Sequence, residues 1–214
     1  KENNNMVDIK YGSQKGTGDT NQDFILCKQL ADDCIIIVLA DGMGGLQYGD
    51  IAATTVAKSI YDTLANQQTG DTKEMLCKAF EEADLAIADK CRSLYSKMGA
   101  AVTVLVIKGD TAYYAWQGNV RLYGKQNDCL LQLTEDHVKN GTDNTLLTRC
   151  VNGKGFRYPI SVQEAKVSEY SLLFLCTDGF YQSKDCMSLV NDGLLPSNVE
   201  GIEDDSSYVL IKFL

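Results

Sequence analysis

The stretch CIIIVLADGMGG, residues 34–45, decides the expected fold. Its first seven residues, 34–40, are apolar, which predicts a strand buried in the protein core. Asp41 follows this run, and three of the next four residues are glycines. A carboxylate at the end of a buried strand, beside a glycine-rich turn, suits a place where the backbone comes close to a metal ion or a phosphate. The same residues are also typical of an ordinary tight turn between a strand and a helix.

Other carboxylates border apolar runs in the same way. They are Asp23, Asp178 and the pair Asp204–Asp205. A folded sheet could bring such residues together, and a cluster of oxygen ligands suits Mg²⁺ or Mn²⁺. Zinc usually takes His or Cys ligands, and His137 is the only histidine, which argues against a histidine-based site. As the side chain whose pKa lies nearest neutrality, His137 invites a general-acid role.

The remaining apolar patterns predict short strands and long helices. Runs rich in β-branched and aromatic residues predict strands at 24–28, 34–40, 101–108, 111–116, 120–124, 171–176 and 207–213. Apolar residues at helical spacing predict helices at 49–66 and 72–97. Hairpin-like strands interrupted by long helices favour an α+β fold over a parallel βαβ repeat.

Short motifs recur along nearly the whole chain. In order, they are NQD at 21–23, DGMGG at 41–45, MGAA at 98–101, GNVR at 118–121, LTEDH at 133–137, CTDG at 176–179 and DDSS at 204–207. This ordered set resembles the metal-dependent protein serine/threonine phosphatases of type 2C, the PPM family. Met43 after the first Asp-Gly resembles the bacterial branch, since a His is common at this position in the eukaryotic one. The resemblance implies a four-layer αββα sandwich of two antiparallel sheets flanked by helices, with a third helix at 183–192.

The resemblance also implies a metal site and a reaction. Asp41 would bridge two Mn²⁺ or Mg²⁺ ions, and the carbonyl of Gly42 would ligate one of them. Asp178 and Asp204 would complete the other, while Asp23 would ligate directly or orient bound water. His137 would be a structural residue near the site rather than a general acid. Asp41 and Asp178 would then be the catalytic residues of a protein serine/threonine phosphatase that hydrolyses phosphoserine and phosphothreonine by a metal-bridged water.

Three departures from the family pattern bear on activity. Asn119 stands where the family has an Asp associated with a third metal, so a third ion would be held weakly or not at all. No arginine precedes the NQD motif, and Lys15 is the available cation for the substrate phosphate. The flap near 138–145 is short, which suits an open, shallow site with broad or partner-directed specificity.

Two alternative functions stay open on the sequence. One is a degenerate relative, a pseudophosphatase that keeps the fold and serves as a binding or regulatory module. The other is a different metal-dependent phosphoester hydrolase with a similar carboxylate site. Retention of the full carboxylate set favours a phosphatase over the first, and substrate profiling would separate it from the second.

Length and composition fit one phosphatase-like domain over residues 1–214, with 44% hydrophobic and 23% charged residues. A net charge of −9 argues against a nucleic-acid partner, and the expected partner is a phosphoprotein substrate. No apolar run is long enough to span a membrane, and the polar start is unlike a secretory signal. Eight cysteines without a Cys-x-x-Cys pair are interpreted as reduced core thiols of a cytoplasmic protein. Oligomeric state is not predicted.

Overall fold

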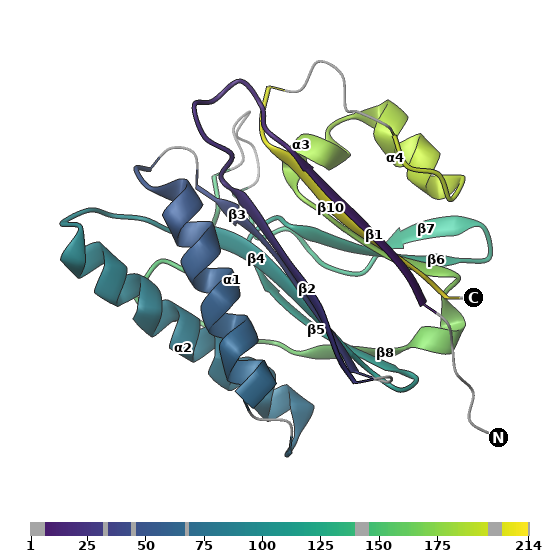
Figure 1. The fold of residues 1–214 in the computed structure, drawn as a ribbon, viewed down its shortest axis with the longest axis horizontal. Helices are drawn as coiled ribbons and strands as arrows, with labels where there is room; N and C mark the ends of the chain where they lie inside the picture. The colour runs from purple at the N-terminus through teal and green to yellow at the C-terminus, as the bar shows by residue number, and fades with distance from the viewer. Residues whose placement is uncertain are drawn as a thin grey trace.

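Two five-stranded antiparallel sheets form the centre of the computed structural model (Figure 1), which describes residues 7–31, 34–43, 46–66, 69–139, 146–196 and 203–213. The first sheet has the order β1-β10-β9-β6-β7, and the second has the order β2-β3-β4-β5-β8. The strands are β1 Val7–Gln14, β2 Asp23–Ala31, β3 Cys34–Gly42, β4 Ala100–Lys108, β5 Thr111–Gln117, β6 Arg121–Gln126, β7 Cys129–Gln132, β8 Gln163–Lys166, β9 Leu172–Cys176 and β10 Ser206–Phe213. The helices are α1 Gly49–Asn66, α2 Thr72–Ser93, α3 Asp178–Tyr181 and α4 Lys184–Asn191, with a 3-10 turn at Val167–Glu169.

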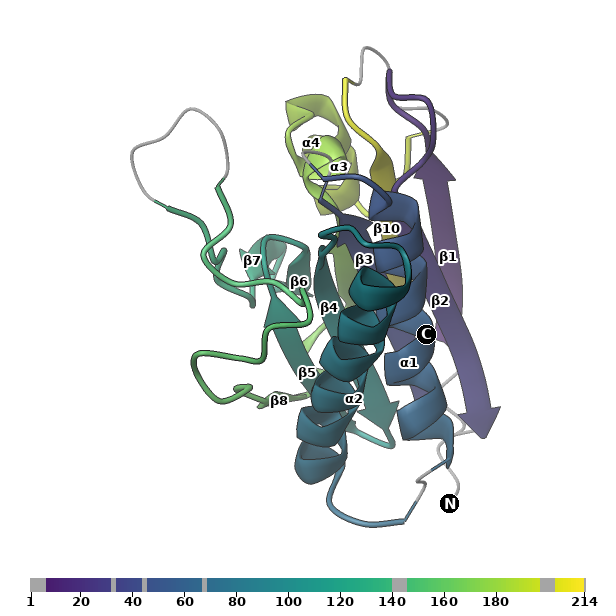
Figure 2. The same cartoon turned by 90° about the vertical axis from the view of Figure 1, so that its left-hand side faces the viewer.

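Helices cover the outer face of each sheet. The long pair α1 and α2 packs on the second sheet, and the short pair α3 and α4 lies against the first (Figures 1 and 2). The expected αββα sandwich is therefore confirmed.

The location of strand β3 explains why apolar and polar residues do not alternate along it. Its even-numbered residues Ile36 and Val38 pack against α1 and α2, whereas the odd-numbered Ile37 and Leu39 pack between the two sheets. Successive side chains of a strand point to opposite faces, so a strand buried on both sides must be apolar throughout.

The predicted elements differ from the observed ones mainly at their ends. Helix α1 has the predicted bounds, and α4 begins after Ser183, whose hydroxyl accepts the Cys186 N–H at 3.4 Å. The prediction for α2 was too long, because the helix ends at Ser93 and Tyr95 adopts a positive φ of 49°. That turn redirects the chain into β4.

Strands β1, β7 and β8 were not predicted from the sequence. Strand β1 pairs along its whole length with β10, but none of its residues is fully buried and it has no continuous apolar run. The strands β7 and β8 have only four residues each and are mostly exposed. Edge strands of this kind carry little hydrophobic signal.

All eight cysteines are free thiols, as predicted. The interpretation of all eight as core residues was too broad, since Cys129 is exposed and only Cys176 and Cys186 are fully buried. Among the described residues, no helix is long and apolar enough to cross a membrane.

Candidate metal centre

The four predicted carboxylates come to the same end of the sandwich. Asp23 begins β2 and is directly opposite Asp41 near the end of β3. Asp178 follows β9, and Asp204 precedes β10, its antiparallel neighbour. Adjacent antiparallel strands place the end of one beside the start of the next, so residues far apart in the sequence meet at one edge.

Asp23 is a buried carboxylate with one unpartnered oxygen. The Thr177 hydroxyl donates to its Oδ2 at 2.9 Å, whereas Oδ1 has no hydrogen-bond partner among the described residues. Burial raises the pKa of Asp23 to about 7, and the Ser207 and Thr177 side chains oppose that rise. The charges of Asp205 and Asp178 add to it. A buried oxygen without a donor is the kind of group that a cation satisfies.

Asp41 and Asp178 are subject to the same excess of negative charge. Burial raises the pKa of Asp41 well above its ordinary value, followed by the charges of Asp23, Asp178 and Asp204. Burial and the Asp204 charge likewise raise the pKa of Asp178. Buried like charges favour protonation unless a cation neutralises them, so this donor set fits a divalent metal ion.

The carboxylates are neighbours, and the Asp41 and Asp178 side chains lie within hydrogen-bond reach of each other. No three acidic, histidine or cysteine side chains of the described residues are close enough to hold one ion as they stand.

Asp204 and Asp205 have different surroundings. Asp205 is buried, and its two oxygens accept the backbone N–H groups of Gly16 at 2.8 Å and Gln22 at 2.6 Å. Asp204 is exposed and accepts the Asp205 N–H at 2.9 Å. Because Asp205 is used to hold the β1–β2 connection, the geometry favours Asp204 as the metal ligand.

Two glycines permit close packing around these carboxylates. A methyl group on Gly42 would collide with the backbone of Gly49 at the start of α1, and one on Gly179 would collide with the Asp205 carbonyl. Gly42 also donates its N–H to the Gln22 carbonyl at 2.9 Å, which ties β3 to the residue before Asp23. Gly42 of the DGMGG motif and Gly179 of the CTDG motif are thus required by packing.

Asn119 contacts the centre directly. It is 5% exposed, and its Nδ2 donates to Asp178 Oδ2 at 3.1 Å. This hydrogen bond partly offsets the raised pKa of Asp178. The side chain at the predicted third-metal position, Asn119, therefore donates a hydrogen bond to Asp178, one of the predicted ligands of the two main ions.

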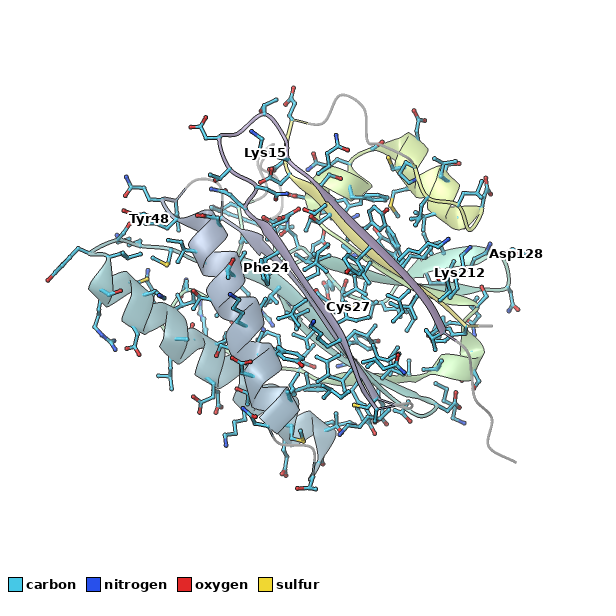
Figure 3. The ribbon with its side chains drawn as sticks, in the orientation of Figure 1. Lys15, Phe24, Cys27, Tyr48, Asp128 and Lys212 are labelled. Atoms are coloured by element: carbon cyan, nitrogen blue, oxygen red, sulfur yellow. The ribbon has the colours of Figure 1, made fainter. Side chains whose placement is uncertain are left out.

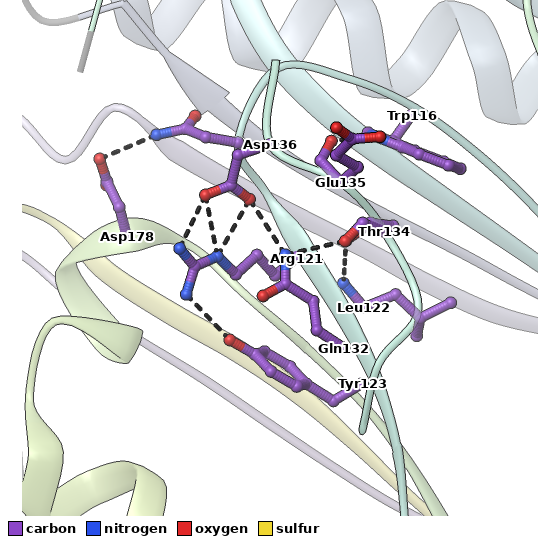
Figure 4. A network of polar contacts seen from close by, with 10 residues as sticks. Trp116, Arg121, Leu122, Tyr123, Gln132, Thr134, Glu135, Asp136 and Asp178 are labelled. Carbon is purple, nitrogen blue, oxygen red and sulfur yellow. Dashed lines mark hydrogen bonds and ion pairs between the residues drawn. The ribbon is translucent and has the colours of Figure 1, made fainter. Parts of the chain in front are cut away.

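An arginine that the sequence analysis left without a role joins two motifs (Figure 4). Arg121 Nε and Nη2 donate to both oxygens of Asp136, at distances from 2.7 to 3.1 Å. The guanidinium also lies 3.6 Å from the ring centre of Tyr181 in α3, the helix that begins with Asp178. The opposite charges in the GNVR and LTEDH motifs were the signal that could have suggested this pair.

His137 is built into the structure, as expected. Its ring stacks on Trp116 with 5.8 Å between centres, and its Nδ1 accepts the Gly118 N–H at 3.2 Å. Burial and the Arg149 charge lower the pKa of His137 to about 4. The ring is therefore neutral near pH 7 and has no proton to give as an imidazolium.

Lys15 lies in the β1–β2 connection, away from Phe24 and Cys27 further along β2 (Figure 3). Its ammonium donates to the Gly18 carbonyl at 2.7 Å. The connection borders a hollow of about 440 Å³ that also includes Asp204 and Asp205. Phosphate binding by Lys15 stays a prediction, because in the structure its ammonium binds a backbone carbonyl of the same loop.

Only the ends of the predicted flap are described. Val138 pairs with Leu147, the Lys139 N–H donates to the Leu146 carbonyl, and the Thr148 N–H donates to the His137 carbonyl. Residues 140–145 of the predicted flap lie outside the described residues.

The class defined by this fold and site is a two-sheet sandwich with a carboxylate cluster at one end. The family model described as Protein phosphatase 2C matches residues 13–201. The chain therefore belongs to the protein phosphatase 2C family.

Relatives and solved structures agree with this assignment. A serine/threonine phosphatase stp of Listeria innocua is 31% identical over 108 residues, which cover 48% of this chain and 43% of that protein. The chain thus matches less than half the length of this relative. Stp1 from Staphylococcus aureus has the same fold, with a TM-score of 0.84, 16% identity and coverage of 98% of this chain and 96% of that one. The catalytic domain of PstP, solved in complex with two manganese ions, has a TM-score of 0.78, 18% identity and coverage of 98% and 100%.

Proposed function

We propose that this chain is a metal-dependent phosphatase that removes phosphate from phosphoserine and phosphothreonine in proteins. The observation that carries the proposal is the convergence of carboxylates at one end of the sandwich, where buried Asp23 has an oxygen, Oδ1, without a hydrogen-bond partner among the described residues. Family membership supports it, and so do the phosphatase names of the relatives and the manganese in the PstP structure.

The proposed cofactors are two Mn²⁺ or Mg²⁺ ions. Asp41, Asp178, Asp204 and Asp23 would hold them, together with the Gly42 carbonyl. Divalent ions bound there would neutralise phosphate charge and make water acidic enough to react near neutral pH. No strong third ion is proposed, because Asn119 adds no negative charge.

The other polar residues would position these ligands. Thr177 holds one oxygen of Asp23, and Asn119 holds one oxygen of Asp178. Asp205 fixes the loop that carries Lys15, the candidate contact for the substrate phosphate. Ligands fixed by surrounding hydrogen bonds lose less entropy when they bind a metal or substrate.

The proposed setting is the cytoplasm, with a phosphoprotein as partner. Eight free thiols suit a reducing compartment, and they are the observation that favours this location. The short flap predicted near 138–145 suits a protein substrate better than a small enclosed molecule.

The test is phosphate release from a pool of phosphoserine and phosphothreonine peptides in Mn²⁺, in Mg²⁺ and in chelator. Release is expected with metal, and Asp41→Asn should abolish it while leaving the fold intact. Asp62→Asn on the exposed side of α1 is the matched control and should behave as the unaltered protein.

Near-normal turnover in Asp41→Asn would overturn the mechanism. Metal binding without phosphate release would favour the regulatory alternative. Preference for a phosphodiester or a small phosphomonoester over every phosphopeptide would favour a different phosphoester hydrolase.

A further inference from the structure

Two arginines share one exposed tyrosine in the segment between β7 and β8. The guanidinium carbon of Arg149 lies 4.7 Å from the ring centre of Tyr158, and that of Arg157 lies 5.5 Å from the same centre. The tyrosine is 49% exposed. An arginine packed on a ring is held in place while the N–H groups at the edge of its plane stay available to an anion.

The charges of these arginines are not neutralised within the described residues. The ion pairs found there involve other cations, and no carboxylate pairs with Arg149 or Arg157. The Arg149 charge contributes, after burial, to the lowered pKa of His137. A cationic pair with no carboxylate partner in the described part of the chain stands out in a protein with a net charge of −9.

The segment that carries the pair passes beside the candidate metal centre. The Arg149 carbonyl is 3.7 Å from where a Cβ on Gly118 would lie, and the next residue, Asn119, donates to Asp178. Val151 then pairs with Ala100 through two N–H···O bonds of 3.0 Å. The segment continues along the outer side of the molecule toward β8, in green at the left of Figure 2.

We propose that Arg149, Arg157 and Tyr158 form a docking surface for acidic side chains of the phosphoprotein substrate. The inference rests on the proposed function and adds a substrate class: phosphopeptides with acidic residues close to the phosphorylated one. Because both guanidiniums lie over the same ring, the distance between them cannot exceed the sum of their distances to the ring centre. An extended peptide advances about 3.3 Å per residue, so acidic residues two or three positions apart can reach both.

The test compares two phosphopeptides that differ only at the flanks, one carrying Glu and the other Gln. The unaltered protein should have a higher kcat/KM for the acidic peptide, mainly through a lower KM, and salt should reduce the preference. Arg157→Gln should lower the preference about threefold, and the Arg149→Gln/Arg157→Gln double variant about tenfold. Arg157→Lys should keep part of the preference, and Arg157→Glu should reverse its direction.

Lys10→Gln is the charge-matched control, because Lys10 is an exposed cation of β1 on the opposite side of the molecule (Figure 2). Each rate is divided by that variant's rate on p-nitrophenyl phosphate, which corrects for the amount of folded, active protein. Fluorescence anisotropy of the labelled peptides in chelator measures binding independently of turnover.

Equal acidic-to-neutral ratios in the unaltered protein and the double variant, both in turnover and in anisotropy, would overturn the docking surface. Failure of the unaltered protein to hydrolyse any phosphoester would instead contradict the proposed function. In that case anisotropy still decides whether the arginines select acidic peptides.

Discussion

At the scale of single residues, Asn119 controls charge at the candidate metal centre. Its amide donates to Asp178, a carboxylate whose pKa is raised by burial and by Asp204. An acid at position 119 would replace this donor with another negative charge. A change at position 119 should therefore alter both the stability of the metal-free protein and its affinity for cations.

Asn119→Asp should destabilise the metal-free protein by about 1–3 kcal/mol, because it removes a hydrogen bond and buries a charge. It should also gain more stability from Mn²⁺ than the unaltered protein does, and we expect turnover to rise as a third ion binds. Thermal unfolding in chelator and across a Mn²⁺ titration measures both effects on stability. Asn119→Ser, which loses the amide without adding charge, is the control, and an equal Mn²⁺ gain in the two variants would contradict the prediction.

The lowered pKa of His137 predicts that the protein loses stability in mild acid. Its pKa is about 4 in the folded protein and 6.5 ordinarily, so between these values the unfolded chain binds a proton that the folded chain excludes. The contribution is fully present above pH 6.5 and falls as the pH decreases toward 4. The loss should be about 1–2 kcal/mol, since solvent screens a partly buried ring. Urea unfolding between pH 7 and 4.5 should show a shallower pH dependence for His137→Gln, and an unchanged slope would sink this assignment.

At the scale of elements, Asp84 connects α2 to the segment after the flap. Its carboxylate accepts the backbone N–H groups of Asn152 at 3.2 Å, Gly153 at 2.8 Å and Gly155 at 2.7 Å. Gly153 and Gly155 have positive φ values of 77° and 74°, a conformation that glycine adopts without strain. The same segment pairs Val151 with Ala100 and so supports the start of β4.

Asp84→Asn should cost about 2–3 kcal/mol of stability, because an amide keeps one acceptor oxygen and sets its NH₂ group against a backbone donor. Urea unfolding measures the loss, and hydrogen exchange should accelerate at the Gly153 and Gly155 amides. Asp89→Asn, further along the same helix and exposed, is the matched control. Equal stabilities of the two variants would show that the three contacts contribute little.

The elements also show which parts of the fold a sequence reveals. The continuous run of β3 predicts a strand because both of its faces are buried, and α1 has a clear apolar stripe. Strand β1 has no such signal, since its pairing with β10 depends on backbone hydrogen bonds that any sequence can make. The end of α2 depends on the positive φ of Tyr95, a residue with no strong preference for turns.

At the scale of the whole molecule, the candidate site forms where the two sheets end together. Asp23, Asp41, Asp178 and Asp204 were predicted as a set because each borders an apolar run in an ordered family pattern. The sequence could not assign Asp205 to the Gly16 and Gln22 amides, nor Thr177 to Asp23, because those contacts join distant parts of the chain. Motifs identify which residues meet, whereas packing decides which oxygen remains for a cation.

The carboxylates that would bind the metal ions also destabilise the metal-free fold. In the absence of metal, burial and three neighbouring carboxylates raise the pKa of Asp41, so its ionised form destabilises the fold. A folded pKa above the ordinary 3.8 means that stability falls as the pH rises through the folded value. Removing the charge should relieve this cost.

Asp41→Asn in chelator at pH 7.5 should therefore be more stable than the unaltered protein by about 1–3 kcal/mol, and the difference should grow as the pH is raised from 3.8 toward the folded pKa of Asp41. Adding Mn²⁺ should reverse the order, because the unaltered protein gains binding free energy that the variant lacks. Thermal unfolding with chelator or Mn²⁺ gives both comparisons, with Asp62→Asn as the control for removing one surface charge. Should Asp41→Asn gain as much from Mn²⁺ as the unaltered protein, Asp41 would not be a metal ligand. A variant less stable than the unaltered protein in chelator would show that the buried charge is already compensated by the fold.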